Sequence, residues 1–201
     1  MDISEIPSQA KLPTSFAEFQ IRIFQEQSTG LDHVALTLGS MAGPDPVLTR
    51  IHSECLTGDV FSSLRCDCGP QLNASLAAIA ERGWGVVLYL RQEGRGIGLH
   101  AKIQAYNLQD KGMDTVDANL MLGHPDDARD YQIASTMLSA LGVNEVCLLS
   151  NNPDKVTQLA TYGITVVDRL PLVVGIGEEN REYLATKIER MGHLIEMDGS
   201  D

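Results

Sequence analysis

The chain has 201 residues, 43% of them hydrophobic, and its 15 basic and 27 acidic residues give a formal net charge of −12. No apolar run approaches the ~20 residues of a membrane span, and no basic run could neutralise nucleic-acid phosphates. We therefore expect neither a membrane protein nor a nucleic-acid binder. A small anionic ligand is still compatible with this charge, because a few arginines in one pocket outweigh the net charge locally.

The N-terminus and the cysteines indicate the compartment. The opening MDISEIPSQAKLP has neither the basic start nor the apolar middle of a secretory signal. The four cysteines are irregularly spaced and do not indicate a disulfide framework. We expect a cytoplasmic protein with reduced thiols.

The first fifty residues are predicted to be rich in β-strands. Residues 19–24 and 33–38 alternate β-branched or aromatic residues with polar ones, and a turn signal at 28–30 separates them. A third strand is expected over 47–51, after the breaker Gly-Pro-Asp-Pro at 43–46.

From residue 69 onward, helical and strand patterns alternate. Apolar residues at helical spacing predict helices from 70 to 82, from 99 through 106, over 127–141, from 153 through 160, and from 184 through 191. Short apolar runs predict buried strands over 86–90, 146–149 and 164–167, and Cys147 is expected to be a packing residue within the second of these.

This order of elements predicts an α/β fold with α+β character. A β-rich N-terminal part would join a mixed, partly parallel sheet flanked by helices. We expect a single domain over 1–201, with a β-rich part at 1–68, an α/β part at 69–195 and a loose tail at 196–201.

Three of the four cysteines lie in the stretch RIHSECLTGDVFSSLRCDCG, at Cys55, Cys66 and Cys68. Three thiolates can bind Zn²⁺ and leave a fourth tetrahedral position for water, as in catalytic zinc sites. The alternative is that these are buried or incidental thiols, although the segment is too polar for a core. His52 could be a fourth ligand, but a histidine at a strand end more often forms hydrogen bonds or contacts a ligand.

Three loops could take part in chemistry. The loop QEGRGIG at 92–98 follows a buried strand and opens a helix, so its backbone N–H groups could bind an anion; the alternative is simply a tight turn. The loop SNNPDK at 150–155 follows the strand 146–149 in the same way. If the two strands are parallel neighbours, both loops face one crevice. The third, HPDDARD at 124–130, could equally be a helix start whose acidic residues complement the helix dipole.

These motifs resemble GTP cyclohydrolase II, the enzyme that commits GTP to riboflavin synthesis. The resemblance rests on RIHSECLTGD at 50–59, LRCDCG at 64–69 and RQEGRGIGL at 91–99, and LLSNNP at 148–153 and MGHL at 191–194 extend it. The resemblance covers nearly the whole chain. It is to the free-standing form of the enzyme, without a fused dihydroxybutanone phosphate synthase.

The resemblance implies hydrolytic opening of the guanine imidazole ring, with release of formate and pyrophosphate. The product would be 2,5-diamino-6-hydroxy-4-(5-phosphoribosylamino)pyrimidine. It also implies one catalytic Zn²⁺ per chain, Mg²⁺ bound with the triphosphate, and a homodimer.

Site residues are assigned by the same resemblance. Cys55, Cys66 and Cys68 would bind the zinc, and Tyr106, Asp127 and Arg129 would be catalytic. The residues that fall where the family contacts GTP are Arg50, Ile51, His52, Ser53, Glu54, Gln71, Glu93, Gly94, Arg95, Thr115, Ser150 and Lys155.

One implied role conflicts with side-chain chemistry. The family pattern assigns Arg129 as a nucleophile and Asp127 as a proton acceptor, yet arginine stays protonated in proteins and has no free lone pair. On physical grounds we expect Arg129 to stabilise charge at the α-phosphate, with Asp127 orienting it or a water molecule.

Two other functions remain open at this stage. The first is a related enzyme that stops at the formamidopyrimidine intermediate, which the presence of Tyr106 argues against. The second is a non-catalytic, zinc-stabilised nucleotide-binding module. Departures from the family pattern are small: Ser150 stands where threonine is common, and Asp154 where lysine is frequent.

Overall fold

A computed structural model describes residues 3–43, 45–125 and 127–196 of the chain. The strands are β1 Ile3–Pro13, β2 Glu18–Glu26, β3 Asp32–Leu38, β4 Val47–Ser53, β5 Gly85–Leu90, β6 Glu145–Leu149 and β7 Thr165–Leu170. The α-helices are α1 Leu56–Asp59, α2 Cys68–Arg82, α3 Gly98–Gln109, α4 Thr115–Met121, α5 Gln132–Ala140, α6 Pro153–Thr161 and α7 Arg181–Met191. Two short 3₁₀ helices, η1 Glu93–Gly96 and η2 Glu178–Asn180, complete the described elements.

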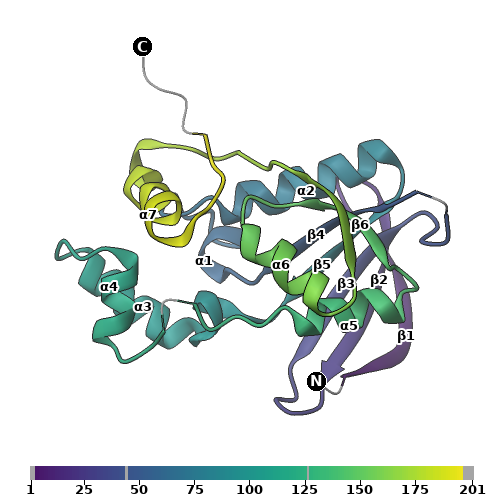
Figure 1. The fold of residues 1–201 in the computed structure, drawn as a ribbon, viewed down its shortest axis with the longest axis horizontal. Helices are drawn as coiled ribbons and strands as arrows, with labels where there is room; N and C mark the ends of the chain where they lie inside the picture. Colours follow the sequence, from purple (N-terminus) through teal and green to yellow (C-terminus); the bar gives the residue numbers. More distant parts are fainter. Residues whose placement is uncertain (1–2, 44, 126, 197–201) are drawn as a thin grey trace. The chain divides into compact units, whose positions relative to one another are not determined.

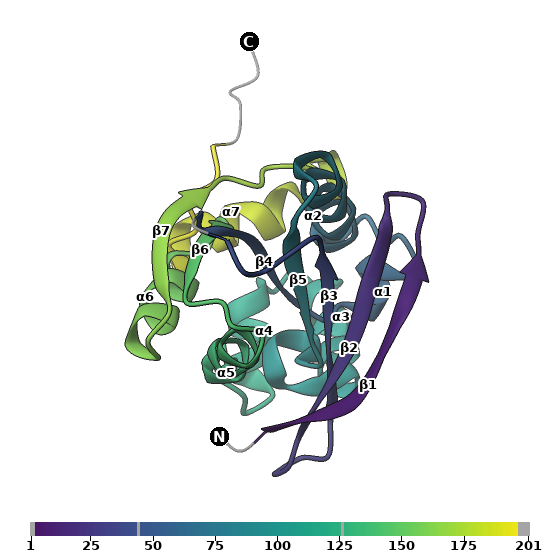
Figure 2. The same ribbon diagram turned by 90° about the vertical axis from the view of Figure 1, so that its right-hand side faces the viewer.

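The strands form one sheet in the order β1-β2-β3-β5-β4-β6-β7, which can be followed in Figures 1 and 2. The pairs β1–β2, β2–β3 and β3–β5 are antiparallel, whereas β4–β6 and β6–β7 are parallel. The sequence prediction of a mixed, partly parallel sheet in an α/β fold is confirmed.

The described residues divide into two compact units, each made of three separate segments. The first unit comprises Met1–His52, Asn73–Arg91 and Asp130–Leu172, and the second comprises Ser53–Leu72, Gln92–Arg129 and Val173–Asp201. From the sequence we expect a single domain over 1–201, whose β-rich part ends at residue 68 and whose α/β part begins at residue 69. This expectation stays a prediction. The predicted tail lies, except for Glu196, outside the described residues.

The sheet and its core belong to the first unit. Apolar residues of β2 to β6 pack against α5, from which Ile133, Met137 and Leu138 are at most 1% exposed. Their i, i+4, i+5 spacing places them on one face of the helix, as the sequence pattern predicted. The core fixes β4 and β6, whose carboxyl ends carry Arg50, Ile51, His52 and Ser150.

The second unit consists of helices and loops. Helix α3 contacts η1 and α4, and α7 contacts α4 and η2. The segment with the three cysteines also belongs to this unit, since Cys55 precedes α1 and Cys68 is the first residue of α2.

One sequence prediction is corrected by this fold. The helix predicted over 127–141 begins only at Gln132, because Asp130 Oδ1 accepts the backbone N–H of Gln132 and Gln158 Oε1 accepts that of Tyr131. These side-chain acceptors end the loop directly before the helix. The condition on which a shared crevice of the two loops depended is not met, since β4 lies between β5 and β6.

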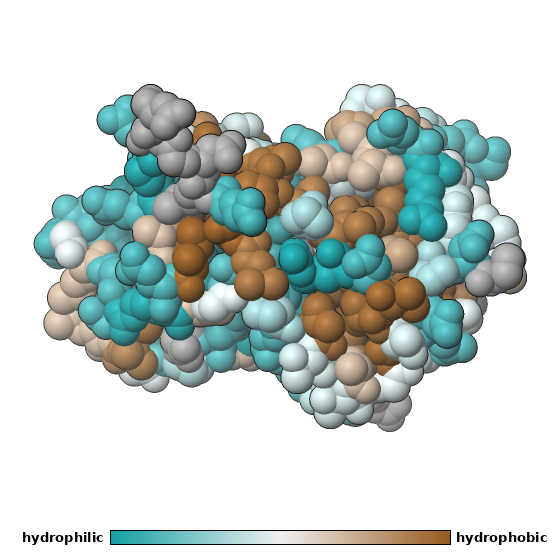
Figure 3. Space-filling view, turned by 45° about the horizontal axis from the view of Figure 1, so that its top comes forward, coloured by the Kyte–Doolittle hydropathy of each residue, from teal (hydrophilic) through white to brown (hydrophobic). Residues whose placement is uncertain are grey.

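The surface carries several exposed hydrophobic side chains. Val60, Phe61 and Leu64, all in the segment between Cys55 and Cys66, are 63–69% exposed. On the face drawn in Figure 3, hydrophobic patches lie among hydrophilic ones. Within residues 3–43, 45–125 and 127–196, no helix has both the length and the apolar character needed to cross a membrane.

Candidate functional site

The three cysteine sulfurs of the second unit converge. The Sγ atoms of Cys55, Cys66 and Cys68 all lie within 4.8 Å of one another, and those of Cys55 and Cys66 are 3.6 Å apart. Sulfurs bound to one tetrahedral zinc at about 2.3 Å each would be about 3.8 Å apart. The donor set and its spacing therefore fit a zinc ion.

Two glycines allow this convergence. A Cβ atom on Gly58 would lie 2.9 Å from Cys66 Sγ and 3.2 Å from Cys55 Sγ. A Cβ atom on Gly69 would lie 2.3 Å from the carbonyl oxygen of Gly58. Position 58 needs glycine because the cysteine side chains crowd it, and position 69 because the start of α2 approaches the backbone of α1 this closely.

The thiols strongly influence one another's ionisation. Hydrogen bonds from the Cys66 and Cys68 thiols, with Lys102 beside the sulfur, lower the pKa of Cys55 far below its ordinary value. The hydrogen bond to Cys55 raises the pKa of Cys66 to about 11, and Cys55 likewise raises the pKa of Cys68. Cysteine binds a metal as the thiolate, so a metal that binds all three sulfurs must displace the thiol protons that remain.

Glu93 and Lys102 hold Cys55 from one side. Glu93 Oε2 accepts the backbone N–H of Leu56 at 2.7 Å, and Glu93 Oε1 accepts that of Gly94 at 2.8 Å. Lys102 Nζ donates to Glu93 Oε1 at 2.8 Å and to Cys55 Sγ at 3.2 Å. Burial alone would lower the pKa of Lys102, but the bond to Glu93 and the nearby Cys55 thiolate raise it, so the side chain is an ammonium.

Tyr106 lies close to the same sulfur. Its hydroxyl is 3.4 Å from Thr57 Oγ1, which is 3.7 Å from Cys55 Sγ. The guanidinium of Arg65 lies 4.9 Å from the ring centroid. Burial raises the pKa of Tyr106, so the group is a neutral phenol that can donate a proton.

A second buried ion pair joins the cysteine segment to helix α7. Asp67, between two of the cysteines, is 2% exposed. It accepts from Lys187 Nζ of α7 at 2.6 Å and from Gln71 Nε2 at 2.6 Å. Lys187 Nζ also lies 4.5 Å from the ring centroid of Tyr183. Helix α7 is therefore anchored directly to the segment that carries Cys66 and Cys68.

Arg95, Asp127 and Arg129 form a further group in the second unit. Asp127 Oδ1 accepts from Arg129 Nε at 2.8 Å, and Arg129 Nη2 is paired with Asp127 Oδ2. Burial would raise the pKa of Asp127, but the bond from Arg129 lowers it, so the carboxylate is ionised. The carbonyl of Arg95 accepts the N–H of Ala128 at 3.0 Å, which ties this loop to η1. Arg95 itself has a φ of 61°, a left-handed conformation that is costly without glycine and is frequent at functional sites.

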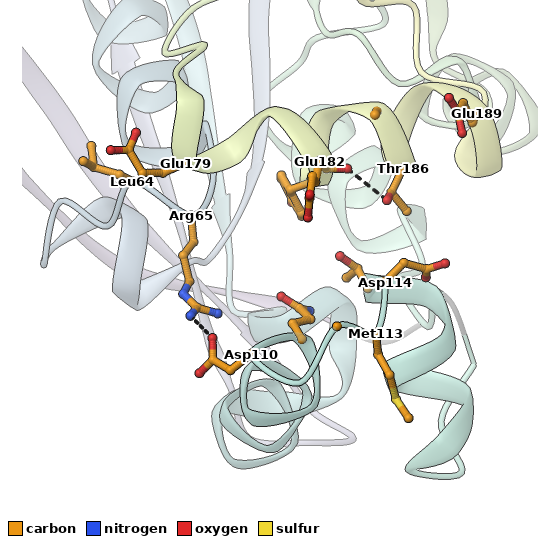
Figure 4. A pocket seen from close by; sticks show the side chains of 14 residues that line it. Leu64, Arg65, Asp110, Met113, Asp114, Glu179, Glu182, Thr186 and Glu189 are labelled. Atoms are coloured by element: carbon orange, nitrogen blue, oxygen red, sulfur yellow. Dashed lines mark hydrogen bonds and ion pairs between the residues drawn. The ribbon is translucent and has the colours of Figure 1, made fainter.

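A pocket of about 700 Å³ also lies within the second unit (Figure 4). Side chains of α7, among them Glu182 and Thr186, face Asp110 and residues 112–115 across it. Arg65, which pairs with Asp110 at its wall, directly precedes Cys66. This volume falls within the ~300–1,000 Å³ of small-molecule sites.

The first unit gathers cationic side chains at the ends of its central strands. Arg50 Nη1 donates to the carbonyl of Leu149 at 3.0 Å, and Lys155 Nζ donates to the carbonyl of Ile51 at 2.7 Å. Both side chains belong to residues that are 5% exposed. Lys155 lies in the first turn of α6, where the helix dipole also favours an anion.

Comparison with known proteins assigns the family. The family model described as GTP cyclohydrolase II matches residues 5–171. The chain belongs to the GTP cyclohydrolase II family. The prediction of an enzyme of this class, made from the resemblance, is confirmed at the level of the family.

Individual relatives are similar over nearly the whole chain. A GTP cyclohydrolase-2 from Acinetobacter baumannii (strain SDF) is 59% identical over 195 residues, which cover 96% of this chain and 98% of the relative. A GTP cyclohydrolase-2 from Pseudomonas paraeruginosa (strain DSM 24068 / PA7) is 57% identical over 186 residues, covering 92% and 91%. The relative from Pseudomonas aeruginosa (strain LESB58) gives the same identity and coverage.

The comparison with solved structures is less informative. A two-domain 3,4-dihydroxy-2-butanone 4-phosphate synthase from A. baumannii, RibBX, matches with a TM-score of 0.40 and 15% identity. The match covers 99% of the present chain and 40% of the synthase chain. A TM-score of this size does not establish a shared fold.

The two units divide the residues that the GTP cyclohydrolase II resemblance selects. The first unit holds Arg50, Ile51, His52, Ser150 and Lys155. The second holds the three cysteines, Ser53, Glu54, Gln71, Glu93, Gly94, Arg95, Tyr106, Thr115, Asp127 and Arg129. Within each unit the structure describes how these side chains are held, and their roles toward GTP stay predictions.

Three residues of the site could not be predicted from the sequence. Lys102, Lys187 and Tyr183 lie on α3 and α7, outside the apolar stripes by which these helices were predicted. A buried lysine gives no periodic signal, because its position in the sequence is that of an ordinary helix-surface residue. Asp67 offered a partial signal, since an acid between two candidate metal ligands needs a nearby donor if it is buried.

Proposed function

We propose that this chain is a zinc-dependent GTP cyclohydrolase II that opens the imidazole ring of GTP. The reaction releases formate and pyrophosphate and gives 2,5-diamino-6-hydroxy-4-(5-phosphoribosylamino)pyrimidine. The observation that carries the proposal is the convergence of three cysteine sulfurs in a chain 57–59% identical to proteins named GTP cyclohydrolase-2.

In this proposal Cys55, Cys66 and Cys68 hold one Zn²⁺ per chain. When bound, such an ion supplies a water molecule of lowered pKa for attack at C8 and at the resulting formamide. The sulfurs support this role because they leave one tetrahedral position free of cysteine ligands.

Tyr106 would act in the ring-opening steps. Its neutral phenol, 3.4 Å from Thr57 Oγ1, can give a proton to a ring nitrogen as the C8–N bond breaks. Glu93 and Gln71 are fixed by hydrogen bonds beside the cysteines and would orient the base.

Cationic side chains would bind and activate the triphosphate. Arg50, Lys155 and Arg95 suit this task, the arginines through their planar fork and the lysine as a point charge. Mg²⁺ would accompany the phosphates. We further propose that the active species is a homodimer.

Arg129 would stabilise charge developing at the α-phosphate. Its guanidinium is paired with the ionised Asp127, which fixes its direction but does not remove its proton. Mass spectrometry of the enzyme quenched during turnover should therefore find no nucleotide attached to Arg129. A covalent adduct that disappears in Arg129→Lys would contradict the assignment.

The test of the function is direct. The purified chain is incubated with GTP and Mg²⁺, and formate, pyrophosphate and the pyrimidine amine are followed together. The proposal predicts that all three appear in equal amounts. Accumulation of the formamidopyrimidine without formate would indicate the related enzyme that stops early, and no reaction at all would indicate a binding module.

A further inference from the structure

Lys102 has a place in the site that the proposed reaction leaves unexplained. It lies on α3, and its residue is 9% exposed. Its ammonium donates to Cys55 Sγ at 3.2 Å and to Glu93 Oε1 at 2.8 Å. Burying a lysine costs free energy unless its charge is paired, so the burial of the Lys102 ammonium needs an explanation.

Glu93 fixes the position of the ammonium. Both of its carboxylate oxygens are already engaged by backbone N–H groups, of Leu56 at 2.7 Å and of Gly94 at 2.8 Å. The carboxylate cannot swing away without breaking these bonds. Lys102 is therefore held against the sulfur by a rigid partner, and the contact is more than a surface ion pair.

The net charge of the proposed metal site explains why a cation lies beside Cys55 Sγ. Three thiolates outweigh the two positive charges of Zn²⁺ by one, and electron donation from thiolates makes the ion a weaker Lewis acid. A thiolate that accepts a charge-assisted hydrogen bond donates less electron density to the metal.

We infer that Lys102 is a positioning residue that weakens electron donation from Cys55 to the metal. This rests on the proposed function, since it takes the three cysteines as zinc ligands. Lys102 acts through Cys55 and does not touch the substrate. The competing explanation is structural: Lys102 would only neutralise Glu93 and help to fold the loop.

Cobalt(II) substitution distinguishes the two explanations, because thiolate-to-cobalt charge-transfer absorption reports the donor strength of the sulfurs. Full-length wild-type protein is loaded with Co²⁺ and compared with Lys102→Met, which keeps the chain length and loses the charge. Lys111→Met is the matched control, since Lys111 is an exposed lysine of the same unit. We expect the band to move to lower energy in Lys102→Met and to stay in place in Lys111→Met.

Kinetics on the zinc enzymes give the second readout. Loss of a residue that supports a metal ligand typically costs about 10- to 100-fold in activity. We expect kcat for formate release to fall in this range in Lys102→Met while KM for GTP changes little. Lys102→Arg, which keeps a cationic donor, should restore much of kcat.

The outcomes separate this inference from the proposed function. A cobalt band that is present but identical in wild type and Lys102→Met overturns the role of Lys102 and leaves the zinc site standing. Absence of any thiolate-to-cobalt band in the wild type contradicts the metal site itself. If Lys102→Met does not fold, Lys102→Gln decides by the same criterion, because it keeps an N–H donor but loses the charge.

Discussion

A side-chain carbon at position 58 would lie 2.9 Å from Cys66 Sγ and 3.2 Å from Cys55 Sγ. We therefore expect Gly58→Ala to push the sulfurs apart and to lower the zinc content of the purified protein well below one ion per chain. Gly43→Ala is the control, since a Cβ atom there has nothing within 4 Å. Metal analysis of both variants after identical purification is the measurement. Full zinc content in Gly58→Ala would show that the sulfurs do not bind the metal in this arrangement.

His33 makes the first unit sensitive to acid. It is 1% exposed, its Nδ1 accepts the N–H of Arg91 at 3.1 Å, and its Nε2 lies 3.5 Å from Glu26 Oε2. Burial lowers the pKa of His33, so the folded chain holds a neutral ring while the unfolded chain binds a proton near pH 6.5. Because the unfolded state then binds more protons, stability must fall as the pH drops below about 6.5.

Denaturant unfolding at pH 7 and pH 5 tests this expectation. His33→Gln can keep an acceptor and a donor but cannot titrate, so its midpoint should change less between the two pH values than that of the wild type. His100→Gln, at an exposed histidine, should behave like the wild type. An equal loss in His33→Gln and the wild type would contradict the neutral His33.

Single residues also show how far sequence reasoning could go at the site. The three cysteines could be selected because their spacing and polar surroundings indicate metal ligands. Lys102 and Lys187 could not, because Cys55 lies 47 positions from Lys102 and Asp67 lies 120 positions from Lys187 in the sequence. Such pairings depend on the tertiary fold, which no local pattern encodes.

At the scale of elements, α7 depends on one buried contact. Lys187 Nζ donates to Asp67 Oδ1 at 2.6 Å, and both residues are at most 8% exposed. Removing one partner of a buried ion pair typically costs about 3–5 kcal/mol, because the other charge is left buried. We expect Lys187→Met to lower the stability of the second unit by about this amount and to increase amide hydrogen exchange along α7.

Arg190 on the same helix provides the comparison. It pairs with Asp114 and Asp117 at the surface, where solvent screens such pairs. Arg190→Met should therefore change hydrogen exchange in α7 very little. If both variants exchange alike, the buried pair does not anchor the helix.

Elements with strong periodicity could be predicted from the sequence, and those without it could not. The strands β2 to β7 and the helices α2, α3, α6 and α7 fall within a few residues of their predicted ranges. Strand β1 carries prolines and polar residues, which suit only an edge strand, and its register shifts between Ile6 and Gln9. Helix α4 is short, and its clearest start signal is Asp114, whose side chain accepts the N–H groups of Val116 and Asp117.

For the whole molecule, the sequence specified a mixed sheet but not its strand order. The two loops at 92–98 and 150–155 would face one crevice if their strands were parallel neighbours, but β4 lies between β5 and β6. Strand order depends on which long connections cross the sheet, and hydrophobic patterns carry little information about that. The sequence also did not predict two units that each draw on three segments of the chain.

The central claim is that a zinc ion held by Cys55, Cys66 and Cys68 is required to open the guanine ring. Its most direct test is to remove zinc stepwise with a chelator and to measure bound zinc, formate release from GTP and circular dichroism on the same samples. We predict that formate release falls in proportion to bound zinc, that far-ultraviolet dichroism is largely retained, and that added zinc restores activity. Undiminished formate release from zinc-free protein would contradict the claim.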